Sequence, residues 1–230
     1  MVRPFSVVWS AGVGLALWFA AAPVEAQSPT MYVAPKRFEL TPIAGWQWGG
    51  SLSTSSGTSL FGAGDLRLKD SFAWGGVLSF LATGGSALEL SYLQQATDLE
   101  FDPAAGGVTT PLGGIDVHYV QIGGRQEFGR GGPFRPFISG SLGIGIFDPQ
   151  PIDPNANLDS DTRFSWSVGG GAKYMFASGR AGLRTDLKLW VTPFPSGDYG
   201  VWCGYYSCTV AEGTEWVTQG QITGGLVLAF

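Results

Sequence analysis

Apolar and polar residues alternate along most of this chain, in segments separated by runs of turn-forming residues. Such alternation, with a period of two, is typical of a β-strand that has one apolar and one polar face. The seventh segment is the clearest, because Arg184, Asp186 and Lys188 alternate with a threonine and two leucines. The pattern predicts eight strands, over residues 37–50, 71–80, 87–101, 115–128, 134–147, 161–176, 183–191 and 214–230.

The fourth predicted strand departs from this pattern in its first half. Val120 and Ile122 alternate with polar residues such as Gln121, but the residues before Tyr119 are out of phase. One extra residue in a strand changes the phase of the alternation, as a β-bulge does. We therefore predict a bulge near Tyr119.

The connections between the predicted strands alternate in length. Long polar segments follow strands one, three, five and seven, over residues 51–69, 102–114, 148–160 and 192–213, and short turns fill residues 81–86, 129–133 and 177–180. A membrane barrel has an even number of strands, long extracellular loops and short periplasmic turns, whereas a soluble sandwich requires no such alternation. The sequence predicts an all-β protein: a single eight-stranded antiparallel transmembrane up-and-down barrel with four long extracellular loops and three short periplasmic turns.

The first residues have the features of an export signal. Arg3 precedes an apolar run over residues 5–22, and the small residues Val24 and Ala26 follow. This order predicts a signal peptide, residues 1–26, cleaved before a barrel domain over residues 27–230. The alternative is an uncleaved membrane anchor, since the run is nearly long enough to span a bilayer.

Composition supports a barrel over other classes. Charged residues make up 13% of the chain and 36 residues are glycine; a soluble domain usually has about twice that charged fraction. After residue 26 no apolar stretch approaches the roughly 20 residues that a membrane helix needs. The net charge of −5 and the lack of a basic cluster predict no nucleic-acid partner.

If the apolar face of each strand meets lipid, the charged face must line the lumen. An isolated charge there carries a large desolvation penalty, so lumen charges need partners or water. Five cationic and four acidic residues make near-complete pairing feasible, which predicts an ion-paired, plugged lumen. The predicted lumen charges are Glu39, Glu89, Arg125, Glu127, Arg135, Lys173, Arg184, Asp186 and Lys188.

Aromatic residues on the opposite face lie toward the ends of the strands. Membrane barrels carry such girdles at the two lipid–water interfaces. The predicted girdle residues are Trp46, Trp48, Trp74, Tyr92, Trp166, Tyr174 and Trp216.

Two cysteines, Cys203 and Cys208, lie in the last predicted loop. In an exported chain such a pair predicts a disulfide. A metal-binding pair is the alternative, but one cysteine pair without a nearby histidine is poor zinc spacing. Aromatic residues around the cysteines form either a binding surface or the packing of the loop onto itself.

Other candidate chemistry is weak. His118 is the only histidine; Asp116 lies on its strand face, but no serine is placed to complete a hydrolase triad. Residues 153–161 alternate oxygen-bearing side chains, as calcium loops do, but Leu158 and Phe164 occupy the positions of the expected glycine and glutamate. We expect no catalytic, metal or cofactor residues.

Two segments resemble a known family. Residues 134–145, with the sequence FRPFISGSLGIG, and the terminal GGLVLAF, residues 224–230, are similar to the opacity-protein and OmpA-like group of eight-stranded outer-membrane β-barrels. The resemblance covers nearly all of the chain after the predicted signal. It implies a place in the bacterial outer membrane among its lipids and lipopolysaccharide, and a role for Phe230 as the signal that the barrel-assembly machinery recognises.

These motifs specify architecture better than activity. The resemblance favours a monomeric, non-enzymatic barrel with a structural role in the envelope or a role in surface interactions. A narrow channel for small solutes or hydrophobic molecules is the alternative, and a lipid-modifying enzyme is the third candidate.

Overall fold

The computed structural model describes residues 37–54, 64–129, 132–150, 160–194, 200–203, 208–211 and 215–230. The predicted signal peptide lies outside these residues, as do parts of three predicted long loops. Among the described residues, no helix is both long enough and apolar enough to cross a membrane.

Eight long strands account for most of the described chain, which confirms the predicted number. Four shorter strands and one 3-10 turn, η1 (Thr83–Gly85), accompany them. The long strands are β1 (Phe38–Gly49), β4 (Ser71–Leu81), β5 (Ser86–Pro103), β6 (Thr110–Glu127), β7 (Phe134–Gln150), β8 (Asp161–Met175), β9 (Ala181–Phe194) and β12 (Glu215–Ala229). The short strands are β2 (Ser51–Thr54), β3 (Gly64–Leu68), β10 (Gly200–Cys203) and β11 (Cys208–Ala211).

The eight long strands form one closed antiparallel barrel. Each pairs with its neighbour in the chain, and β1 pairs with both β4 and β12. At the seam, the Phe38 amide donates to the Phe230 carbonyl at 3.1 Å and the Phe230 amide donates back at 3.0 Å. The C-terminal residue therefore makes the last rung of the ladder, and no long strand keeps an open edge there.

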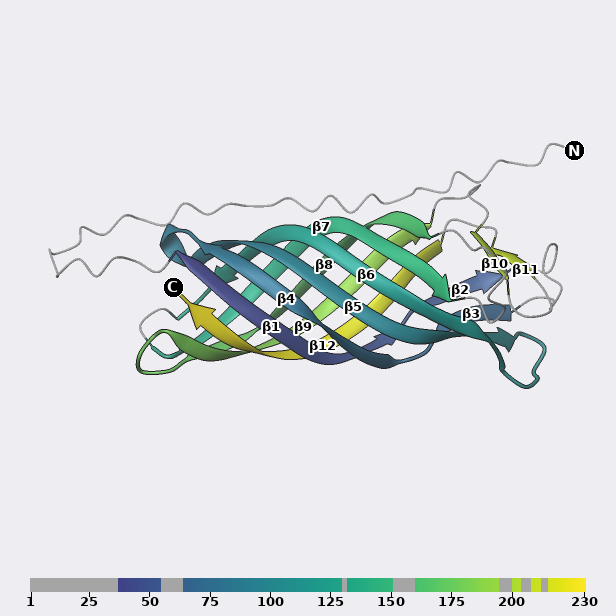
Figure 1. Ribbon diagram of the computed structural model, residues 1–230, viewed down its shortest axis with the longest axis horizontal. Helices are drawn as coiled ribbons and strands as arrows, with labels where there is room; N and C mark the ends of the chain where they lie inside the picture. The colour runs from purple at the N-terminus through teal and green to yellow at the C-terminus, as the bar shows by residue number, and fades with distance from the viewer. Residues whose placement is uncertain are drawn as a thin grey trace, which may run out of the picture. The chain divides into compact units, whose positions relative to one another are not determined.

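The tilt of the strands follows from their register. Paired residues followed around the barrel from Glu39 return to β1 at Gly49, ten residues further along. With strands about 4.8 Å apart and a rise of about 3.4 Å per residue, this shift gives a tilt of about 40° and a backbone radius of about 8 Å. Figure 1 shows the tilt.

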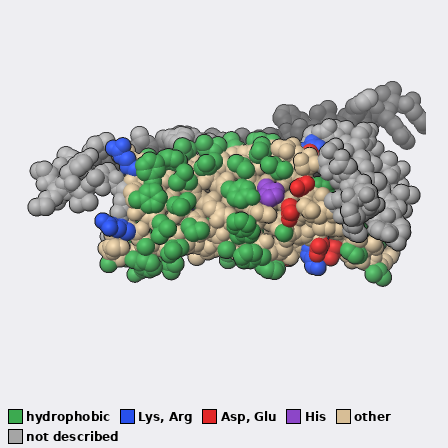
Figure 2. All heavy atoms as spheres, in the orientation of Figure 1, with side chains coloured by type: hydrophobic (Ala, Val, Ile, Leu, Met, Phe, Trp, Pro, Cys, Tyr) green, Lys and Arg blue, Asp and Glu red, His purple; other side chains and the backbone are tan. Residues whose placement is uncertain are grey.

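One end of the barrel carries Phe230 and the three short connections, and we call it the turn end; the opposite end is the loop end. Outward side chains between the ends are apolar, and Figure 2 shows them covering much of one face, with charged side chains toward both ends. Six of the seven predicted girdle residues are exposed on the outside of the barrel, and Trp166 is half-buried.

The predicted bulge near Tyr119 is wrong. The pairing of β5 with β6 runs without interruption through Tyr119, which faces Leu93, and its register shifts only between Leu99 and Glu100. The phase changes because the two faces exchange character near the loop end: Ile115 and Val117 point inward and are buried, while Asp116 and His118 point outward. The exposed apolar side chains of the long strands form a belt on the outside of the barrel, which we call the apolar belt. Between this belt and the loop end, the outer surface is polar and the interior is apolar.

Three predicted loops are also corrected, because they contain strand. Residues 51–69 include β2 and β3, and β3 pairs with residues 99–103 at the loop end of β5. The segment 102–114 is largely an extension of the β5–β6 hairpin, since β5 ends at Pro103 and β6 starts at Thr110. Part of the predicted loop 192–213 also forms the β10–β11 pair.

Two consecutive glycines of β4, Gly75 and Gly76, lie on opposite faces of the strand and differ in the space around them. A Cβ at the inward Gly75 would lie 2.0 Å from the carbonyl oxygen of Tyr92, whereas a Cβ at the outward Gly76 would have only the Thr41 carbonyl oxygen near it, at 3.8 Å. We predict that Gly75→Ala lowers the free energy of unfolding by about 2 kcal/mol, as overpacking does. Gly76→Ala should change it by less than about 0.5 kcal/mol.

Reversible urea unfolding of the refolded protein in lipid vesicles would measure both changes. Equal effects of the two substitutions would contradict the register of β4 against β5.

Candidate functional site in the barrel lumen

Four charged side chains form an alternating ring near the turn end. Arg125 lies 2.9 Å from Glu39 and 2.8 Å from Glu127, and Lys173 lies 2.7 Å and 2.5 Å from the same two carboxylates. All four side chains are buried. Each cation contacts both acids and each acid contacts both cations, so charge alternates around the ring. Arg135 reaches Glu127 from the rim at 3.7 Å and keeps a third of its side chain exposed.

A second group adjoins this ring on the loop-end side. The Arg184 guanidinium donates to both oxygens of Glu89, at 2.7 and 3.2 Å, and to both oxygens of Asp186, at 2.8 and 2.7 Å. Arg125 lies 3.1 Å from Glu89 and so joins the two groups. The Arg184 guanidinium also stacks over the Phe137 ring, 4.7 Å from its centroid. Bidentate pairing on two sides is the strongest arrangement available to a guanidinium.

Several of these contacts cross the lumen. Glu39 lies on β1 but meets cations from β6 and β8, and Glu89 on β5 meets Arg184 on β9; none of these strand pairs are neighbours in the barrel. Buried pairs of this kind contribute little net stability, but removing one partner leaves an uncompensated charge. The network therefore ties opposite walls together and depends on every member.

The structure joins eight of the nine predicted lumen charges into this one network and leaves out Lys188. The Lys188 side chain is buried, with 7% of the residue exposed. No carboxylate of the described residues lies within ion-pair distance of it, and its ammonium lies 5.8 Å from the centroid of the Trp190 ring.

Sequence reasoning missed a second set of contacts across the lumen. Tyr119 on β6 donates its hydroxyl to the Gln219 side chain on β12 at 2.7 Å, and the Gln219 amide donates to Gln95 on β5 at 3.1 Å. Gln47 donates to Gln219 at 2.9 Å. Glutamines at inward positions were the available signal, since Gln47 falls on the polar face of its strand. We call these four residues the glutamine bridge.

An apolar cluster fills the interior toward the loop end, and sequence reasoning missed it too. The Tyr119 ring packs on Trp190 with centroids 4.5 Å apart and edge-to-face on Phe147 at 6.4 Å. The out-of-phase half of the fourth strand was its signal. Buried members near the loop end are Leu66, Leu99, Phe101, Leu112, Ile115, Val117, Phe147 and Val217.

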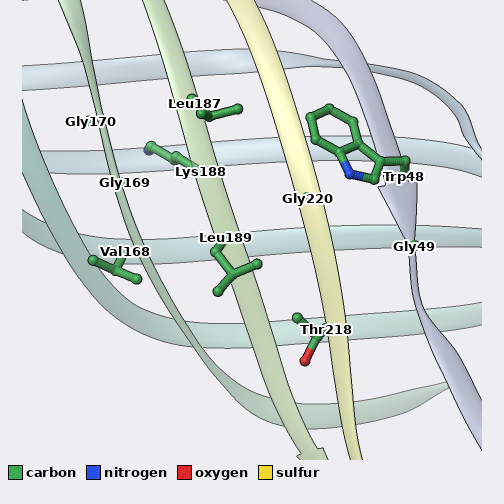
Figure 3. Close-up of a pocket in the computed structure, with 10 residues that line it drawn as sticks. All are labelled: Trp48, Gly49, Val168, Gly169, Gly170, Leu187, Lys188, Leu189, Thr218 and Gly220. Atoms are coloured by element: carbon green, nitrogen blue, oxygen red, sulfur yellow. The ribbon is translucent and has the colours of Figure 1, made fainter.

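Two hollows lie beside these layers. One, of about 320 Å³, opens at the turn end next to Glu127, Arg135 and Lys173. The other, of about 630 Å³, lies on the outward face, where Gly170 and Gly220 leave space among Trp48, Val168, Leu187 and Leu189; Figure 3 shows this arrangement. The first meets the ion-pair network and the second meets the apolar belt.

The remaining candidate residues do not assemble a reaction centre. His118 is half-buried on the outer surface and its Nδ1 lies 3.0 Å from the Tyr92 hydroxyl, while Asp116 accepts from Gln150 at 3.3 Å. No group of three metal-ligating side chains occurs among the described residues. Most of the calcium-like segment lies outside them, as do the side chains of both cysteines, although the backbones of Cys203 and Cys208 are paired.

The chain matches a family model over most of its length. The model describes the outer membrane protein beta-barrel domain, and it matches residues 11–194. The chain belongs to this family. The predicted relation to outer-membrane barrels and the predicted location in the bacterial outer membrane are thereby confirmed. No curated protein sequence matches the chain.

Solved outer-membrane barrels share the fold. OprG from Pseudomonas aeruginosa is 11% identical, with a TM-score of 0.53 over 85% of this chain and 97% of that chain. Neisserial surface protein A is 12% identical, with a TM-score of 0.51 over 84% of this chain and 97% of that chain. The Escherichia coli outer membrane protease OmpT is 9% identical, with a TM-score of 0.47 over 87% of this chain and 99% of that chain. At these identities the likeness to OprG and to Neisserial surface protein A establishes the fold alone.

A double-mutant cycle tests the coupling across the lumen of this outer-membrane barrel. We predict that Glu89→Ala and Arg184→Ala each lower the free energy of unfolding by about 3 kcal/mol, because each leaves a buried charge without its partner. Their double mutant should cost less than the sum by at least about 1 kcal/mol. Urea unfolding of the four proteins in vesicles measures the cycle.

The matched control is the exposed pair Arg67 and Asp102, 3.5 Å apart on the surface. Its coupling should be below about 1 kcal/mol, as for other surface pairs. A coupling of Glu89 to Arg184 no larger than this control would mean that the pair does not hold the walls together.

Proposed function

We propose that this protein is a non-enzymatic outer-membrane barrel whose lumen is closed by its own side chains. On this proposal it supports the envelope, or interacts at the cell surface, through its loop end. One observation carries the proposal: buried pairs join opposite walls of the barrel at two levels, in the ion-pair network and in the glutamine bridge.

The dimensions of the barrel support a closed lumen. Eight strands enclose an interior that side chains can fill, whereas open pores need more strands. Here arginines, two lysines, a tyrosine and a tryptophan occupy that interior, and the rest of the apolar cluster lies toward the loop end. A path for ions would have to displace several of these contacts at once.

The orientation that we propose places the turn end in the periplasm and the loop end outside the cell. Both termini and short turns are periplasmic in outer-membrane barrels. Polar outward residues near the loop end, such as Asp98 and Glu100, would then lie level with the lipopolysaccharide headgroups. Phe230, exposed at the turn end, would be available to the assembly machinery in the periplasm.

A narrow channel is the second candidate function. The hollow at the turn end favours it, because that hollow reaches Lys173 and Glu127 of the network. A lipid-modifying enzyme has less support. The described partners of His118 and Asp116 are Tyr92 and Gln150, and neither supplies the serine nucleophile of a hydrolase triad.

Planar-bilayer recording of the refolded protein separates a closed barrel from a channel. We predict no steady conductance for the wild type, because the network and the glutamine bridge block the lumen. A combined Tyr119→Ala and Gln219→Ala variant should admit more current, since it removes the bridge, whereas Arg67→Ala on the surface should not. A steady wild-type conductance that Arg184→Ala abolishes would overturn the proposal in favour of the channel.

We also propose that residues 1–26 are removed on export and that Cys203 and Cys208 form a disulfide in the β10–β11 ribbon. Cross-strand pairing of their backbones places the two residues opposite each other. The intact mass and N-terminal sequence of the exported monomer should show a chain that starts at Gln27 and has no free thiols. Two titratable thiols under oxidising conditions would contradict the disulfide.

A further inference from the structure

The lumen holds one more positive charge than its ion-pair network balances. The eight joined side chains comprise four cations and four carboxylates, so the network has no net formal charge. Lys188 is a ninth, buried charge outside it. Asp186, two residues away on the same strand, pairs with Arg184 through both of its oxygens and lies beyond ion-pair distance of the Lys188 ammonium.

Lys188 has an unsatisfied donor as its neighbour. Gln221 on β12 is its cross-strand partner and is 1% exposed. The Trp190 indole donates to the Gln221 oxygen at 2.9 Å, which fixes the orientation of the amide. The Gln221 nitrogen then has no acceptor among the described residues, and the nearby hydroxyl of Thr223 has no partner there either. Buried donors of this kind ordinarily have a partner.

The Lys188 stem occupies the place that a side chain at Gly169 would take. Gly169 faces Lys188 across β8 and β9, and a Cβ on it would lie 2.8 Å from the Lys188 Cγ. Figure 3 shows Lys188 beside Gly169 and Gly170. The lysine stem therefore packs against a bare stretch of strand, with Gln221 on its other side.

We propose that Lys188 and Gln221 bind a small monovalent anion, of the halide class, inside the lumen. An anion supplies the missing charge and accepts from both nitrogens at once, and the Thr223 hydroxyl is a third donor within the same wall. A water molecule would accept hydrogen bonds from these nitrogens but would not balance the charge of Lys188. Burial of the site favours a small ion over sulfate or phosphate. The site does not depend on whether the lumen conducts.

The first test locates the ion in the wild-type protein. Crystals grown in sodium bromide should show an anomalous peak within hydrogen-bonding distance of Lys188 Nζ and Gln221 Nε2. A water molecule in place of bromide, or no peak there, would overturn the proposal.

The second test measures binding in solution. Urea unfolding would compare sodium bromide with sodium gluconate at equal ionic strength; guanidinium chloride is unsuitable because it supplies a halide. For a dissociation constant of about 10 mM, about 100 mM bromide should raise the folding equilibrium constant about tenfold. Sodium sulfate should give no such increase.

Lys188→Met should remove the bromide effect while keeping most of the length of the side chain, and Gln221→Leu should weaken it. Lys69→Met, at a lysine exposed on the surface, is the matched control and should keep the full effect. A wild type that responds equally to bromide and gluconate, or a Lys188→Met variant that keeps the bromide response, would contradict the site.

Discussion

A strand that crosses hydrocarbon must pair all of its backbone groups, because lipid offers no partner for a free amide or carbonyl. In this chain the constraint is met by the pairing of β1 with β12, which closes the ladder down to the Phe38–Phe230 rung. Closure with a ten-residue shift fixes the tilt and the narrow radius. The narrow radius in turn brings side chains of opposite walls within reach of one another.

The interior is layered as a consequence. Strand closure puts the charged faces inside, and the radius lets a carboxylate such as Glu39 meet cations from strands that are not its neighbours. The desolvation of each charge in the ion-pair network is offset by a partner of opposite sign. Toward the loop end the interior is filled by apolar residues and not by ion pairs, since the outer surface there is polar and the apolar residues point inward.

The strands and their faces could be predicted because alternation depends on each strand alone, and the nine candidate lumen charges come from the same alternation. Which acid meets which cation could not be predicted, because that depends on the ten-residue shift around the barrel. The same limit explains the misplaced bulge: the reversal of faces before Tyr119 reflects what surrounds β6, not its own geometry. The glutamine bridge was missed because glutamine at an inward position does not by itself identify a partner.

The most direct test of a closed lumen is the chemical accessibility of its middle. Ser91 is buried on β5 between Glu89 of the network and Gln95 of the bridge. A cysteine at this position, in protein refolded into lipid vesicles, should stay unmodified by a small charged thiol reagent until the barrel unfolds. A cysteine at the exposed Val108 should react at once. Modification of both positions at similar rates in the folded protein would contradict a lumen closed by its own side chains.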